Sequence, residues 1–102
     1  MTEERFSPFT VEEALAFLIR SMDEHERQKL KEMPENDLIL LHHGFGSWVR
    51  NVLNMWNNEP LLREITRLGG MRYSHPDDAS MFLIEELWRR LQDDFQKNSL
   101  KD

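Results

Sequence analysis

Apolar side chains recur at helical spacing near the start of the chain. After Thr10 they fall on one face of a helix at about 100° per residue. This face is formed by Val11, Leu15, Leu18, Ile19 and Met22. Thr10 and Glu13 have the spacing of a capping box immediately before the series. The pattern predicts an amphipathic helix that begins after Thr10.

Two contrasting segments follow this first helix. Residues 23–32 are almost all charged, with Leu30 as their one strong apolar residue, and we expect a surface helix there. Residues 35–56 are the most apolar stretch and predict the central helix of the fold. Gly44 and Gly46 lie inside this stretch, where each costs up to about 1 kcal/mol relative to alanine, so a kink or break is allowed there. For Gly46 we favour a close approach of another backbone.

Prolines and glycines mark the bounds of two further helices. Asn58 suits the start of one of them, with Pro60 in its first turn, and Gly69–Gly70 suits its end. The last helix follows residues 74–78, in which a cap, a first-turn proline and two acids suit the positive end of the helix dipole. Its apolar face is predicted to be long and buried, and runs from residue 83 to residue 95.

These elements together predict an all-α fold, a single compact bundle of about five helices, because no segment alternates in the manner of a strand. At 102 residues the chain has the usual size of one domain with one core. We expect an N-terminal extension over residues 1–9, a helical domain over 10–96 and a C-terminal tail over 97–102.

Composition narrows the function classes. The chain has no cysteine, no signal-peptide pattern and no apolar run long enough for a membrane span, so we expect a soluble cytoplasmic protein without disulfides. Its net charge of −6 disfavours nucleic acids and anionic membranes as partners. The acidity suits a basic partner surface, although a charge that keeps a small protein soluble is the simpler interpretation. We expect no cofactor and no metal, since the familiar nucleotide, calcium and zinc motifs are absent.

Two clusters of polar residues are candidates for a binding site. In the central segment, His42 falls near the apolar face and is expected to be partly buried, while Arg50 and Asn51 follow Trp48 outside that face. Each of the three also has a purely structural interpretation. His42 could be a hydrogen-bonded core residue, and Arg50 and Asn51 could bond the central helix to its neighbours. We favour a pairing of Arg50 with an aspartate at the start of the last helix, because arginine matches carboxylates bidentately.

The second cluster opens the last helix. His75, Asp77 and Asp78 combine imidazole and carboxylate groups, which suits metal ligation or acid–base chemistry. Ser80 lies nearby and adds the residue types of a Ser/His/Asp arrangement, but no nucleophile elbow accompanies it. Ordinary capping of the helix start explains the same aspartates, and we favour that explanation.

Three apolar residues, Phe17, Leu40 and Phe82, fall off the faces of their predicted helices. Either the bundle buries these helices on two sides, or the three residues form an exposed interface that another protein covers. The first alternative is favoured, and the second is kept as a candidate interface.

Two sequence blocks resemble a known family. The first is HHGFGSWVRN over residues 42–51 with Trp56 after it, and the second is HPDDAS over residues 75–80 with Trp88 after it. They resemble the L-H-x-G-x-G-x-W-I-R-N block followed by L-W, and the H-P-D-D-A-S block before L-W-x-x-L, of small bacterial domains of unknown function. Val49 and Met55 stand where isoleucine and leucine are usual. The resemblance spans residues 10–91 and implies no activity, cofactor or substrate. It points to His42, Gly46, Trp48, Arg50, Asn51, His75, Asp77 and Asp78 as shared positions.

The leading hypothesis for function is a non-enzymatic protein-interaction or regulatory module, an inhibitor, immunity-like factor or adaptor, whose partner is another protein. The alternative is a small enzyme or ligand-binding domain with a polar site between the third and fifth helices, built from the residues of the two clusters.

Overall fold

The computed structural model describes the backbone of residues 5–101 and the side chains of residues 5–92. Its α-helices are α1 (Val11–Ser21), α2 (Glu24–Glu32), α3 (Phe45–Val52), α4 (Glu59–Gly69) and α5 (Pro76–Lys101). Three short 3₁₀ helices lie between them, η1 (Glu35–Leu41), η2 (Met55–Asn57) and η3 (Met71–Tyr73). No strand occurs in these described residues, and the predicted all-α bundle with five α-helices is confirmed.

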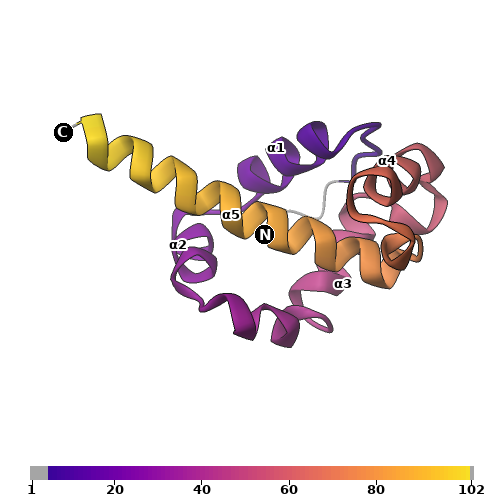
Figure 1. The fold of residues 1–102 in the computed structure, drawn as a ribbon, viewed down its shortest axis with the longest axis horizontal. Coiled ribbons are helices and arrows are strands. Elements are labelled where there is room, and N and C mark those ends of the chain that lie inside the picture. Colours follow the sequence, from indigo (N-terminus) through magenta and orange to yellow (C-terminus); the bar gives the residue numbers. More distant parts are fainter. Residues whose placement is uncertain (1–4, 102) are drawn as a thin grey trace.

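Helix α5 is the axis of the fold. It crosses the whole molecule, and its C-terminal turns extend beyond the other helices (Figure 1). The helices α1 to α4 all pack against it, as do the three 3₁₀ helices. Leu83, Ile84 and Leu87 of α5 are fully buried at the centre of the single hydrophobic core. The sequence pattern had suggested that residues 35–56 form the central helix. In the structure the central helix is α5.

The predicted helical segment over residues 35–56 is not a single helix, and the break that Gly44 and Gly46 allowed does occur. The chain forms η1, turns at residues 42–44, forms α3, and turns again at Asn54, which adopts a left-handed conformation with φ 55°. Gly44 lies at the first break, where the helical penalty of glycine is avoided. The break lets η1 bury Leu38 while α3 buries Val49 and Val52 against the core.

The predicted helix ends are confirmed by hydrogen bonds. The hydroxyl of Thr10 accepts from the Glu13 backbone N–H at 3.1 Å, at the start of α1. Asp23, which was not among the predicted caps, forms a reciprocal capping box at the start of α2. The side chain of Asn58 accepts from the Leu61 backbone N–H at 3.3 Å and caps α4, which ends at Gly69 and is followed by Gly70 with φ 103°.

The off-face aromatic residues are buried inside the bundle. Phe17 is 2% exposed and Phe82 is 9% exposed, so the candidate interface that included them is wrong and the bundle alternative holds for both. The physical reason is that α1 and α5 each have neighbours on two sides: α1 contacts both α4 and α5, and Phe82 packs on Tyr73 of η3. Leu40, in contrast, is 73% exposed on η1.

Side chains from elsewhere satisfy the carbonyls at the ends of α1 and α2. The Trp88 indole N–H donates to the Met33 carbonyl at 2.9 Å, and the Gln92 amide donates to the Lys31 carbonyl at 2.7 Å. Helix α5 therefore holds the C-terminus of the strongly charged α2, which buries only Leu30. The Arg27 guanidinium similarly donates to carbonyls of Ile19 and Met22 at the end of α1.

The predicted N-terminal extension is partly tied to the domain. The Phe6 backbone N–H donates to the Val52 carbonyl at 2.7 Å, and the Asn58 amide donates to the carbonyl of Pro8 at 2.9 Å. Pro8 is buried. At the other end, α5 continues through the predicted boundary at residue 96.

Candidate functional site

The polar residues of the two predicted clusters meet at Arg50. This side chain is 9% exposed, and it extends from α3 toward the start of α5. Its guanidinium donates to the Ser80 hydroxyl at 2.9 Å and to the His42 carbonyl at 3.3 Å. Its Nε lies 3.5 Å from a carboxylate oxygen of Asp77. The pairing of Arg50 with an aspartate of the last helix is confirmed, and it ties α3 to α5.

The start of α5 is capped by His75, and not by Asp77 or Asp78 as the sequence had suggested. The Ser80 hydroxyl donates to the Asp77 carbonyl at 2.8 Å. The Nδ1 atom of His75 accepts from the Asp77 backbone N–H at 3.1 Å, so the imidazole is the cap of the helix. The His75 ring also meets the ring of Trp56 edge-on, with centroids 5.5 Å apart. The Ser80 proton is thus directed at a backbone carbonyl and not at an imidazole base.

Gly46 makes room for the Arg50 cluster. A Cβ atom at this position would lie 3.1 Å from a guanidinium nitrogen of Arg50 and 3.3 Å from the Leu41 carbonyl oxygen. Both separations are tighter than ordinary contacts, and the second is with backbone. The prediction that another backbone approaches Gly46 is confirmed.

Trp48, Asn51 and Asp78 take no part in the hydrogen bonds and ion pair of Arg50 given above, whereas His42 meets Arg50 through its backbone carbonyl. Trp48 is half-buried and stacks on Phe45, with ring centroids 5.4 Å apart. Asn51 is exposed, as is Asp78, which lies at a separate hollow described below. His42 is half-buried and contributes its carbonyl to the cluster, as given above. Within residues 5–92, no group of three or more metal-ligating side chains gathers in a geometry suited to a metal ion.

A ridge on η1 is the second notable feature. Ile39 is 62% exposed and the adjacent Leu40 is 73% exposed, whereas Leu38 before them is buried. Hollows lie beside this ridge, one toward α2 and one toward α5. We call Ile39 and Leu40 the η1 ridge.

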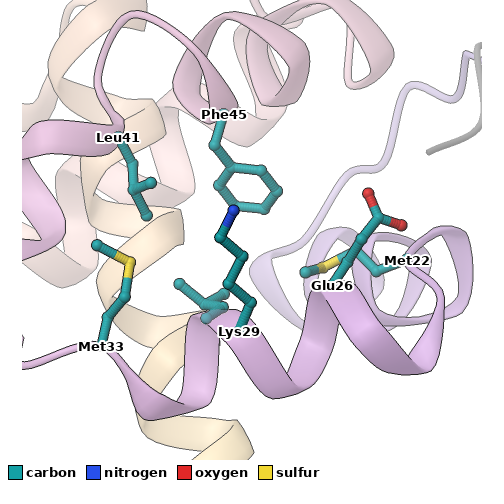
Figure 2. A pocket seen from close by; sticks show the side chains of 7 residues that line it. Met22, Glu26, Lys29, Met33, Leu41 and Phe45 are labelled. Atoms are coloured by element: carbon teal, nitrogen blue, oxygen red, sulfur yellow. The ribbon is translucent and has the colours of Figure 1, made fainter.

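The α2–α3 hollow, which lies between α2 and the start of α3, has a volume of about 210 Å³ and is mainly apolar. It is lined by Met22, Glu26, Lys29, Leu30, Met33, Leu41 and Phe45. Figure 2 shows the Lys29 side chain extending from α2 in the direction of Phe45, with Leu41 and Met33 on one side of it. Flexible methionines and a movable lysine allow such a hollow to adapt to an apolar side chain.

The η1–α5 hollow is lined in part by Ile39 of the ridge and has a volume of about 390 Å³. Its apolar lining includes Leu38 and Met81, which are 2% and 8% exposed. The charged and aromatic groups around it are Glu35, Arg72, Tyr73, Asp78 and Glu85. The Arg72 guanidinium lies over the Tyr73 ring, 4.7 Å from its centroid. The hollow therefore combines an apolar floor with an acidic rim.

The sequence of the chain matches a known family of domains. The family model "Domain of unknown function (DUF6794)" matches residues 7–91. The chain belongs to this family. The match agrees with the resemblance to small domains of unknown function that the two sequence blocks indicated. No curated protein and no solved structure matched the chain.

The region matched by DUF6794 contains the Arg50 cluster, the η1 ridge and both hollows. The sequence patterns had singled out Leu40 but missed Ile39 and the two hollows. A signal was present in the four consecutive apolar residues 38–41, because one face of an amphipathic helix cannot contain four successive positions. Among the helices of the described chain, none is both long enough and apolar enough to cross a membrane.

Proposed function

We propose that this DUF6794 domain is a non-enzymatic protein-interaction module that binds another protein through the η1 ridge and the two hollows beside it. The observation that carries the proposal is the exposure of Ile39 and Leu40 at adjacent positions of η1, whose residues Ile39 and Leu41 line two different hollows. Apolar side chains that protrude beside hollows offer a partner both a surface to cover and pockets to fill.

Other exposed apolar residues of the domain have a weaker claim to this role. Phe9, Trp56, Leu68 and Met71 are each more than half exposed. Isolated apolar residues are common on protein surfaces and need no partner. The η1 ridge differs because its two residues are adjacent and Ile39 itself lines one of the hollows. A partner that covers the ridge would therefore reach into that hollow as well.

The use of the Arg50 cluster supports binding over catalysis. Arg50, Ser80 and the His75 imidazole all make hydrogen bonds that hold helix ends or join α3 to α5. A catalytic side chain needs access to a substrate, and Arg50 and Ser80 are buried. Inhibitors and adaptors act by covering or joining other proteins, which requires a surface such as the η1 ridge and no reactive group.

Affinity capture with a surface variant tests the proposal. The double variant Ile39→Ser/Leu40→Ser removes the ridge, and Phe9→Ser/Leu68→Ser removes a comparable exposed apolar area elsewhere. Each tagged protein is used to capture partners from the native host, and the captured proteins are quantified by mass spectrometry. We expect at least one partner protein that the wild type and the Phe9/Leu68 variant capture in similar amounts. The Ile39/Leu40 variant should capture at least about tenfold less of it.

Circular dichroism and urea unfolding of the three proteins check that the ridge variant remains folded. If every captured protein binds the folded ridge variant as well as the wild type, the proposed surface is not the binding surface.

A further inference from the structure

Some of the carboxylates that the structure describes accept a hydrogen bond or form an ion pair, and others do neither. Several of the carboxylates without a partner lie close together on the surface. Most described carboxylates accept a hydrogen bond or form an ion pair, such as Glu12 with Arg90, Glu86 with Arg89, and Glu64 with the Val11 backbone N–H. Among the described side chains, those with neither interaction are Glu24, Glu35, Asp37, Asp78 and Glu85.

Three of these five unpartnered carboxylates gather at one hollow. Glu35 and Asp37 belong to η1, Asp78 and Glu85 belong to α5, and Glu35, Asp78 and Glu85 line the same hollow. Arg72 is the one cationic side chain in that lining, and it lies over the Tyr73 ring. Within the described chain Arg72 makes no ion pair with the three carboxylates. The rim of the hollow therefore has a net negative charge that the domain does not neutralise itself.

We infer that the η1–α5 hollow receives lysine or arginine side chains from a basic segment of the partner protein, with apolar residues of that segment on the η1 ridge. This inference rests on the proposed function and specifies the chemistry of the partner. The long stem of a lysine or arginine packs on apolar groups while its charged end stays at the polar edge. Leu38 and Met81 offer such an apolar floor, and the three carboxylates offer the edge.

The charge of the domain argues against the other occupants. A second copy of the chain also has a net charge of −6 and would place like charges opposite each other across this acidic rim. A nucleic acid would bring phosphates to the same carboxylates. A basic protein segment is the occupant whose charge complements the hollow, and electrostatic complementarity of this kind guides both association and specificity.

Synthetic peptides test the inference with the full chain. The first probe is an acetylated amphipathic peptide of leucine and lysine, and the second has glutamate at every lysine position. Each is titrated into isotope-labelled protein, and binding is followed by the shifts of the backbone amide signals. We expect the leucine–lysine peptide to shift signals of η1, η3 and the first turns of α5, and to bind more weakly as salt is raised. We expect no binding of the glutamate peptide.

A neutralised variant provides the decisive comparison. Glu35→Gln/Asp78→Asn/Glu85→Gln removes the charge of the hollow, and Glu24→Gln/Glu32→Gln/Glu59→Gln removes the same charge from carboxylates outside it. We expect the first variant to weaken leucine–lysine peptide binding by about tenfold and the second by less than about twofold, since exposed ion pairs contribute modestly and additively.

Equal weakening by the two variants, unaltered binding by the first, or shifts spread over the whole acidic surface would overturn the inference. The inference would also be overturned if the chain associated with itself and the amide signals of η1, η3 and the first turns of α5 shifted as a result. The proposed function would survive each of these results, because capture that depends on Ile39 and Leu40 decides it separately.

Discussion

The Arg50 guanidinium and the Ser80 hydroxyl are joined by a buried hydrogen bond of 2.9 Å between positions 30 residues apart in the chain. The Ser80 hydroxyl in turn donates its own proton to the Asp77 carbonyl, which extends the hydrogen-bonded chain into the first turn of α5. The start of α5 and the body of α3 are thus held by one continuous set of polar contacts. Three acceptors surround one guanidinium, which explains why arginine suits this position.

Replacement of Arg50 is expected to destabilise the domain strongly. Arg50→Met leaves the His42 carbonyl and the Ser80 hydroxyl without their donor and should lower the free energy of unfolding by about 2–3 kcal/mol. Arg50→Lys should cost nearly as much, since one ammonium group cannot reach all three acceptors. Urea unfolding at neutral pH measures both variants. The control is Arg63→Lys at an exposed pair with Glu59, for which a change within about 0.5 kcal/mol is expected.

Phe17 and Leu40 should respond in opposite ways to truncation. Phe17→Ala removes a ring that is 2% exposed and packs on Phe6, and it should cost about 3–5 kcal/mol of unfolding free energy. Leu40→Ala truncates a side chain that is 73% exposed and should change stability by less than about 0.5 kcal/mol. Thermal or urea unfolding compares the two. Similar losses for both variants would contradict the burial described here.

Gly69 is expected to tolerate no side chain. A Cβ atom there would lie 2.6 Å from the Tyr73 ring and 2.8 Å from the Phe82 ring, so Gly69→Ala should push the two rings apart and cost about 1–3 kcal/mol. Gly44→Ala is the matched control, because no atom lies within 4 Å of its Cβ position. We expect this control to unfold at nearly the wild-type urea concentration, and an equal loss for both variants would rule out crowding as the cause.

The ion pair of Glu12 with Arg90 should make stability depend on acid pH. A hydrogen bond and the charge of Arg90 lower the pKa of the Glu12 carboxyl in the folded protein. The contribution is therefore fully present above the unfolded-state pKa of about 4.3 and is lost as the pH falls through the lower folded-state pKa. The melting-temperature difference between wild type and Glu12→Gln should be present at pH 7 and vanish at the lowest pH. A difference that is independent of pH would contradict this ion pair.

The helix ends and the tie between α3 and α5 were accessible to sequence reasoning because they depend on local chemistry. Thr10 and Asn58 cap helices with bonds that span three residues, and the pairing of Arg50 with Asp77 follows from the opposite charges of the two groups. The apolar face of α5 was equally clear from its helical period. Such features need no knowledge of how distant segments pack.

The course of residues 35–56 could not be predicted in the same way. The periodic pattern is compatible with one long helix, and the choice of a break depends on how Leu38 and Val49 reach different parts of the core. The hollows beside the η1 ridge arise from that break, so they could not be predicted either, although the four consecutive apolar residues 38–41 gave a signal for the ridge itself. The burial of Phe17 and Phe82 also depended on tertiary packing. A residue off the main apolar face of a helix is buried only when a second element packs on that side of the helix.

The position of α5 has a consequence for how the protein is made. Every other helix finds its packing surface on this element, which is the last to be synthesised among them. During translation, α1 to α4 would emerge from the ribosome with their apolar faces still uncovered, and they would be open to chaperones until residues 76–91 had left the exit tunnel. Assembly of this domain is then expected to be a late event that follows synthesis of its last helix.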